Sequence, residues 1–304
     1  MPESLSRRTL LGAGLAAGAA AAASTTFASP ARAEESRAVE LPLIGPAEGD
    51  QLHVMSFNVR LPVDDSPNSW PERRPRVAHL LEQERPTVFG IQEGFYGQGQ
   101  DILEDLDGYD WIHLARQGGS NDEATAVYYD SARLKPTAYD HLWLSDTPRL
   151  IGSTTWGNEI TRMLTWVRFS DLAAGGEFVF LNTHFDHQSD AARERSAEMV
   201  RDVVAEFDVP TVVVGDFNTP VGSVPYETLV NGGLEDTWVV AEERLSPEYG
   251  TFNGWNPEPV EGDPRIDWVL ATPGGAALKT AINTWTDGEH TPSDHWAVHS
   301  LLTL

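Results

Sequence analysis

The chain has 304 residues, no cysteine, and 46 acidic against 21 basic side chains, which gives a formal net charge of −25. The absence of cysteine excludes disulfides, and the negative charge disfavours sequence-blind binding to nucleic acids, which are also anionic. A phosphate substrate remains compatible with this charge, because a bound metal ion can reverse the local field.

The N-terminus has the pattern of an export signal. Ser6-Arg7-Arg8-Thr9-Leu10-Leu11 is a twin-arginine pattern, an apolar run follows over 10–23, and Ala31-Arg32-Ala33 is an A-x-A cleavage site. The run is shorter and richer in Gly and Ala than the ~20 strongly apolar residues of a membrane span, so an uncleaved anchor is the weaker interpretation. We therefore predict a twin-arginine signal peptide over 1–33 and a secreted, extracellular protein whose mature form has no transmembrane segment.

The rest of the chain reads as a leader over 34–50 and one domain over 51–304. Short apolar strands that end in polar residues recur in the domain, at 52–60, 87–93, 178–187, 211–218 and 265–271. Helical spacing appears over 72–84, where Pro86 ends the pattern, and over 190–207, and strands follow one another directly around 124–129, 142–144 and 163–169. Helices mixed with antiparallel strands favour an α/β sandwich over a purely parallel sheet.

Three of the polar strand ends are individually weak signals. Asn58 follows the first strand, Glu93 ends "FGIQE", and His184 lies in "NTHFDH" after three apolar residues. Each has an ordinary structural interpretation, as an edge amide, a loop boundary or a buried histidine with a satisfied hydrogen bond.

The later strand ends are stronger signals. Asp216 and Asn218 follow three valines, and positions i and i+2 of an extended chain point to the same side, where two polar groups are costly to bury without a partner. Asp267 interrupts the apolar "RIDWVL" and needs a donor, which His295 in "TPSDHWAV" offers, next to Asp294.

The set of polar strand ends predicts a metal-dependent hydrolase. Oxygen ligands from Asn58, Glu93 and Asp294 suit Mg²⁺, or alternatively Mn²⁺ or Ca²⁺, whereas zinc would ask for more His or Cys. A histidine paired with a carboxylate suits the activation of water. Together these groups suit the hydrolysis of a phosphate ester.

The motifs, taken in order, resemble the endonuclease/exonuclease/phosphatase superfamily of metal-dependent phosphohydrolases, and they are closest to a secreted bacterial branch. The matching stretches are "SFNVR", "IQE", "NTHFDH", "GDFN", "RIDWV" and "SDHWAV". The resemblance implies a four-layer α/β sandwich of two packed mixed β-sheets flanked by helices, with the site at one end.

The resemblance also implies roles for the residues. Glu93 would be the main metal ligand, beside Asn58 and Asp294. Asp216 and Asn218 would orient the attacking water and the phosphate. His295, supported by Asp267, would be the acid/base or phosphate-stabilising histidine. His184 would be the second histidine, which stabilises the transition state or helps the leaving group.

Two departures from the family bear on the substrate. "DPRIDWVL" stands where inositol-phosphatase members carry Trp-Cys-Asp-Arg, and the basic surface usual in nucleases is not evident. We interpret Arg73, Arg74 and Arg76 as a solvated helix face, and an exposed aromatic loop in "TFNGWNPEP" (251–259) would support action at a lipid interface.

We therefore predict a monomeric, secreted hydrolase that cleaves a small or lipid-linked phosphate ester, as a phosphodiesterase or a phosphatase, by in-line attack of water. The alternatives are a secreted nuclease that cuts DNA or RNA and, as a minor possibility, a non-catalytic binding domain or a calcium-stabilised surface domain.

Overall fold

The computed structural model describes residues 39–304. The predicted signal peptide over 1–33 and the first five residues of the predicted leader lie outside the described residues. Within the described part, none of the helices combines the length and the apolar character that crossing a membrane requires.

The domain is built on two mixed β-sheets. One has seven strands in the order β10-β12-β13-β1-β2-β4-β3, and the other has six in the order β5-β6-β7-β8-β11-β9. The strands of the first sheet are β1 Leu52–Asn58, β2 Val88–Gln92, β3 Tyr109–Ile112, β4 Val127–Asp130, β10 Glu243–Arg244, β12 Ala276–Asn283 and β13 Ala297–Thr303. Those of the second are β5 Leu134–Trp143, β6 Met163–Asp171, β7 Glu177–His184, β8 Thr211–Asp216, β9 Glu235–Asp236 and β11 Asp267–Ala271.

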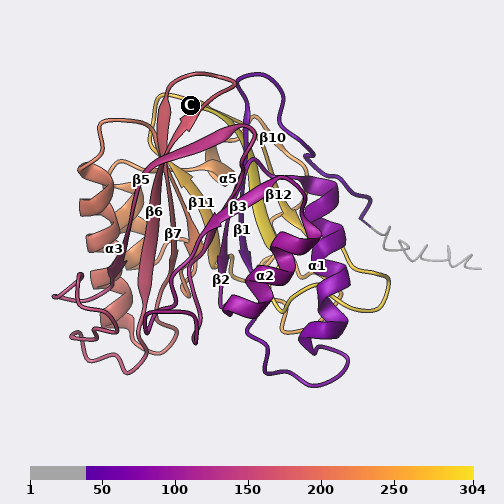
Figure 1. Ribbon diagram of the computed structural model, residues 1–304, viewed down its shortest axis with the longest axis horizontal. Helices are drawn as coiled ribbons and strands as arrows, with labels where there is room; N and C mark the ends of the chain where they lie inside the picture. The colour runs from indigo at the N-terminus through magenta and orange to yellow at the C-terminus, as the bar shows by residue number, and fades with distance from the viewer. Residues whose placement is uncertain (1–38) are drawn as a thin grey trace, which may run out of the picture. The chain divides into compact units, whose positions relative to one another are not determined.

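Helices cover the outer faces of the two sheets, which confirms the predicted four-layer sandwich. In Figure 1, α1 (Trp70–Glu84) and α2 (Tyr96–Asp105) lie beside β1 and β2, and α3 (Asp190–Ala205) lies on the outer side of β5, β6 and β7. The short helices α4 (Val224–Val230) and α5 (Thr237–Val240) complete the domain. The predicted helix boundaries are close to those observed.

Successive side chains of the central strands point into two different buried cores, which explains why these strands are continuous apolar runs in the sequence. In β8, Val212 and Val214 belong to the core between the sheets, whereas Val213 belongs to the core beneath α3. In β1, Val54 faces the inter-sheet core and Met55 the core beneath α1. Both faces of these strands are therefore buried, so no polar alternation marks them.

A buried ionisable cluster binds the end of the leader to the domain. The Glu84 carboxylate, at the C-terminal end of α1, accepts hydrogen bonds from the backbone N–H groups of Leu43, Ile44 and Gly45 at 2.7–3.1 Å. His53 Nδ1 lies 2.8 Å from the Gly45 carbonyl, and its Nε2 lies 2.9 Å from His299 Nδ1. Burial lowers the pKa of both histidines to about 3.

These histidines should make the fold less stable in acid. Below the ordinary histidine pKa of ~6.5, the unfolded chain takes up protons that the folded chain excludes until about pH 3, so the free energy of unfolding falls as pH falls through this window. For each of these histidines, we expect a loss of about 2 kcal/mol between pH 7 and pH 5.

Urea unfolding of His299→Leu at several pH values tests this expectation. The slope of the free energy of unfolding against pH should decrease by the contribution of about one proton. A loss of stability that is the same at every pH does not affect this slope. His79→Leu is the matched control, because it removes an exposed histidine. An unchanged slope in His299→Leu would show that this ring is protonated in the fold.

Candidate active site

The same alternation brings the predicted site residues to one end of the space between the sheets. His184 and Asp216 are the last residues of the parallel strands β7 and β8 and are directly paired in register, and Asp267 is paired with Asp216 across β8 and β11. Asn58 ends β1 in the other sheet and reaches Asp216 with a hydrogen bond of 3.0 Å from Nδ2 to Oδ2. Four strand ends thus converge, as predicted.

Asp216 is the centre of the cluster. Its Oδ2 lies 3.4 Å from His184 Nε2 and 3.7 Å from His295 Nε2, and the side chain is fully buried. Burial and the neighbouring Asp267 carboxylate raise the pKa of Asp216 to about 7, although His295 opposes the shift. A carboxylate with a pKa near neutrality is suited to accept a proton from water.

Asn218 reaches the site through a turn and not through an extended strand. β8 ends at Asp216, Phe217 is buried, and Asn218 has a left-handed backbone (φ 50°) fixed by a hydrogen bond of 2.9 Å from its N–H to Asp216 Oδ1. Its amide lies 3.0 Å from His184 Nε2. The expected shared side is therefore correct, but a local Asp–Asn turn produces it.

The predicted Asp267–His295 pair is present. Asp267 Oδ2 lies 2.9 Å from His295 Nδ1, which leaves His295 Nε2 directed toward Asp216. Burial disfavours the charge on His295, but the carboxylates of Asp267 and Asp216 outweigh it and raise the pKa of His295 to about 10. The imidazolium can therefore donate a hydrogen bond or a proton from Nε2 at neutral pH.

His184 is held neutral by Arg162. Arg162 Nη1 lies 2.8 Å from His184 Nδ1, and burial together with that guanidinium keeps the pKa of His184 well below its ordinary value. A guanidinium only donates hydrogen bonds, so Nδ1 is an acceptor and the hydrogen of the ring stands on Nε2; the Asn218 amide, 3.0 Å from Nε2, can accept this hydrogen only with its oxygen turned toward the ring. His184 is thus equipped to donate a hydrogen bond to a phosphoryl oxygen, in keeping with its expected role at the transition state.

Glu93 and Asp294, the predicted metal ligands, lie beside this cluster. Arg60 lies close to both, with Nη1 3.7 Å from Glu93 Oε2 and Nε 3.6 Å from Asp294 Oδ2. Asn58 donates from Nδ2 to Glu93 Oε1 at 3.0 Å, and its Oδ1 accepts from the Arg60 N–H. In this arrangement Asn58 positions the carboxylate, and ligation through its oxygen would require the amide to turn.

The donor set suits a hard divalent cation. Single ligand atoms of Glu93, His184 and Asp216 lie within 4.8 Å of one another, and burial with the nearby Glu93 raises the pKa of Asp294. Clustered carboxylates of this kind are stabilised by a dication, and oxygen donors select Mg²⁺, Mn²⁺ or Ca²⁺. Glu93 is therefore grouped closely enough with Asp216 and His184 to share a cation, whereas Asp294 lies outside this group and stays a predicted ligand.

Glu93→Gln should raise the concentration of Mg²⁺ needed for half-maximal activity by at least about tenfold, because the substitution removes one anionic ligand. Titration of EDTA-treated protein with Mg²⁺ measures this, with Glu104→Gln, an exposed glutamate on α2, as the matched control. An unchanged Mg²⁺ requirement would show that Glu93 is not a metal ligand and only marks a loop boundary.

Two arginines of the site were not predicted from the sequence. Arg60 stands two residues after Asn58, and the same-side argument applied to Asp216 and Asn218 would have identified it. Arg162 carries no such signal, because it precedes β6 by one residue and reaches His184 only through the pairing of β6 with β7.

Arg73, Arg74 and Arg76 do not form the solvated helix face that the sequence predicted. Arg73 and Arg76 are buried and donate to backbone carbonyls, including those of Val59 and Thr291, and Arg74 is paired with three carboxylates of α2. These arginines join α1 to the loops beneath the site, and the prediction was wrong because sequence spacing does not show what covers a helix.

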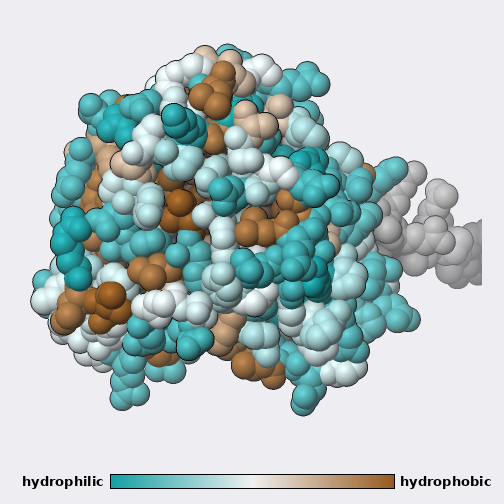
Figure 2. All heavy atoms as spheres, viewed as in Figure 1, coloured by the Kyte–Doolittle hydropathy of each residue, from teal (hydrophilic) through white to brown (hydrophobic). Residues whose placement is uncertain are grey.

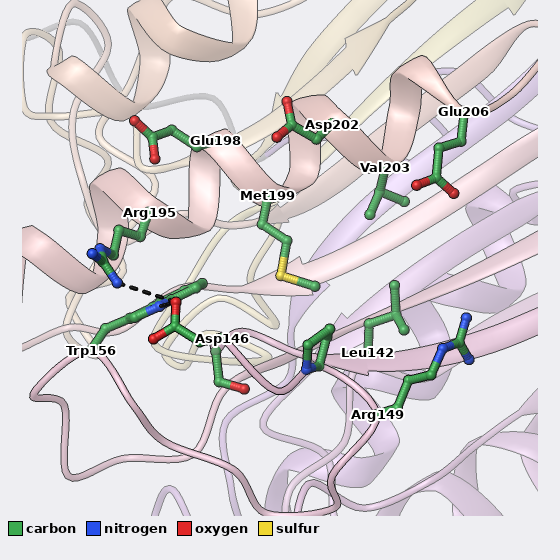
Figure 3. Close-up of a pocket in the computed structure, with 12 residues that line it drawn as sticks. Leu142, Asp146, Arg149, Trp156, Arg195, Glu198, Met199, Asp202, Val203 and Glu206 are labelled. Atoms are coloured by element: carbon green, nitrogen blue, oxygen red, sulfur yellow. Dashed lines mark hydrogen bonds and ion pairs between the residues drawn. The ribbon is translucent and has the colours of Figure 1, made fainter.

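A wide hollow of about 590 Å³ lies away from these residues, between α3 and the loop that follows β5. Figure 3 shows Arg195 against Trp156 and Asp146, with the side chains of Met199 and Val203 directed from α3 toward Leu142. None of the clustered site residues lines it, so it is separate from the chemistry. The face seen in Figure 2 is mostly hydrophilic, with hydrophobic residues in separate patches.

The chain matches the profile of the "Endonuclease/Exonuclease/phosphatase family" over residues 55–295. The mannosyl-6-phosphatase Bt3783 of Bacteroides thetaiotaomicron VPI-5482 has a similar structure, with a TM-score of 0.78, 29% identity, and coverage of 83% of this chain and 100% of that one. An endonuclease/exonuclease/phosphatase family protein from Bacteroides vulgatus has a TM-score of 0.77 at 29% identity, covering 84% and 99%.

More distant structures share the fold. The TDP2 of D. rerio, solved with a single-strand DNA product, has a TM-score of 0.63 at 17% identity, covering 84% of this chain and 99% of that one. The search of curated proteins found no significant match.

Proposed function

Since the chain belongs to the Endonuclease/Exonuclease/phosphatase family and is a phosphoester hydrolase, we propose that it is a secreted, monomeric phosphatase that cleaves a small phosphomonoester by in-line attack of water. The observation that carries the proposal is the buried arrangement of Asp216 between His184 and His295, with Asp267 behind His295 and the carboxylates of Glu93 and Asp294 alongside.

A divalent cation held by Glu93 and Asp294 would supply positive charge to the phosphoryl oxygens. Asp216 accepts the proton of the attacking water, a role that suits its raised pKa. Asn218 fixes the position of this carboxylate through its N–H.

The two histidines act on the phosphoryl group in different protonation states. His295, charged and oriented by Asp267, donates from Nε2 to a phosphoryl oxygen or to the leaving group. His184, neutral and fixed by Arg162, donates a hydrogen bond from Nε2 and does not supply a proton to the leaving group. Both stabilise charge that develops in the transition state.

Three observations support a small substrate over a nucleic acid. Arg73, Arg74 and Arg76 are engaged within the protein, so they offer no basic groove to a duplex. One similar structure, at 29% identity, is that of a mannosyl-6-phosphatase, which favours a sugar phosphate. Phe252 is 55% exposed and lies edge-on to the His295 ring, with the ring centroids 5.1 Å apart, where it can contact the organic part of such a substrate.

Hydrolysis of an aryl phosphomonoester and an aryl phosphodiester tests the proposal. The protein, stripped with EDTA and resupplied with Mg²⁺, Mn²⁺ or Ca²⁺, should release phosphate from the monoester and should leave plasmid DNA and RNA uncut. Cleavage of DNA or RNA at low salt would favour the nuclease instead. Inactivity on every ester and polymer, with the fold intact, would overturn the phosphatase proposal.

A further inference from the structure

Arg60 occupies an unusual position at the mouth of the site. Its backbone has a left-handed conformation (φ 56°), which is uncommon for a residue with a side chain. Three hydrogen bonds hold it there: its N–H donates to Asn58 Oδ1, and its carbonyl accepts from Arg73 Nη2 and Gln98 Nε2. Backbone strain held in place by surrounding contacts is typical of functional positions.

This backbone conformation directs a guanidinium at three carboxylates. Besides its contacts with Glu93 and Asp294, Arg60 donates from Nε to Asp64 Oδ2 at 3.0 Å and from Nη2 to Asp64 Oδ1 at 3.4 Å. Its side chain is 29% exposed, so part of the group faces solvent. By contrast, the neighbouring Arg73 is fully buried, and its guanidinium donates hydrogen bonds to backbone carbonyls.

The guanidinium and a metal ion would compete for the same oxygens. Glu93 and Asp294, the predicted metal ligands, also lie within ion-pair distance of Arg60, at 3.7 Å from Nη1 and 3.6 Å from Nε. Neutralisation of these two carboxylates by a cation leaves Asp64 as the remaining anionic partner of Arg60. Asp64 then holds the guanidinium at the rim of the site, with donors available for a substrate anion.

We propose that Arg60 binds the phosphoryl group of the substrate and makes the site selective for phosphomonoester dianions over phosphodiester monoanions. This inference rests on the proposed phosphatase function. A monoester presents one more unsubstituted phosphoryl oxygen and one more negative charge than a diester, and a planar guanidinium can bind two such oxygens at once. An ammonium lacks this paired geometry, so lysine would not replace Arg60 fully.

Kinetics of Arg60→Gln on 4-nitrophenyl phosphate and bis(4-nitrophenyl) phosphate test the selectivity. We expect kcat/KM for the monoester to fall by about 30-fold, mainly through KM, as for the loss of one or two charge-assisted hydrogen bonds. The value for the diester should fall by less than about threefold, and Arg60→Lys should recover only part of the loss. Arg149→Gln, at an exposed arginine paired with Asp140, is the control and should match the wild type.

Calorimetry supplies a readout that does not depend on turnover. In EDTA-treated protein, Arg60→Gln should bind Mn²⁺ about fivefold more tightly, because a unit positive charge ~4 Å from the ligands has been removed. With Mn²⁺ present, the variant should bind inorganic phosphate more weakly than the wild type does. A wild type that cleaves neither ester would refute the phosphatase function, whereas these two binding shifts would still support Arg60 as a phosphate-binding residue.

Two results would overturn the role of Arg60. One is an equal loss on both esters with weaker Mn²⁺ binding, which would show that Arg60 supports the shape of the site. The other is a variant whose kinetics and phosphate affinity equal those of the wild type.

Discussion

Asp216→Asn is expected to lower kcat by at least ~100-fold while leaving the folded protein at least as stable as the wild type. The loss of activity follows because the amide cannot accept a proton from water. The gain in stability follows from the raised pKa of about 7, which shows that the fold disfavours the charged carboxylate. With a pKa above its unfolded value, Asp216 supports folding in acid, and this contribution is lost as pH rises through 7.

The two effects are measured separately. Steady-state kinetics on the phosphomonoester give kcat, and thermal unfolding at pH 5 and pH 8 gives the stability, with the advantage of Asp216→Asn expected at pH 8. Asp107→Asn, at an exposed aspartate, is the control for loss of one negative charge. A variant that is inactive and also much less stable at pH 8 would assign Asp216 a structural role.

His295→Gln should also lower kcat by at least ~100-fold, and the loss should not add to that of Asp267→Asn. The Asp267 carboxylate is hydrogen-bonded to His295 Nδ1 at 2.9 Å, so once His295 is replaced this carboxylate has no imidazole left to orient. The double variant should therefore turn over as slowly as His295→Gln alone, and its kcat should not be lower by the product of the two single effects.

Stability provides a check on this pair. His295→Gln alone leaves the buried Asp267 carboxylate without its cationic partner and should lower the melting temperature, and Asp267→Asn added to it should restore part of the loss. Additive losses in kcat would contradict the assignment, because they would show that Asp267 and His295 act independently.

The residues that could be predicted from sequence are those that break a local rule. A carboxylate inside an apolar stretch needs a donor, and this requirement predicts the pairing of Asp267 with His295 from the sequence alone. Two polar groups after three valines likewise identified Asp216 and Asn218. Strand and helix periodicity predicted an α/β sandwich, and the resemblance of the ordered motifs to the family implied its four layers.

Other features depend on contacts between distant segments, and no local pattern reports them. Arg162 reaches His184 across two paired strands, and the arginines of α1 donate to loop carbonyls up to 219 residues away along the chain. Arg60 was not predicted, although it stands only two residues after Asn58. Charged residues at helical spacing look alike in sequence whether a loop covers them or water does.

The contact between Glu84 and the backbone of residues 43–45 decides where the chain can be shortened for laboratory production. A version that begins after Gly45 would lose three of the donors that satisfy this buried carboxylate, together with the carbonyl that His53 contacts. A version that begins at residue 39 keeps all of them. The practical N-terminal limit of the domain thus lies about ten residues before its first strand, at a stretch that alignment by motif alone would discard.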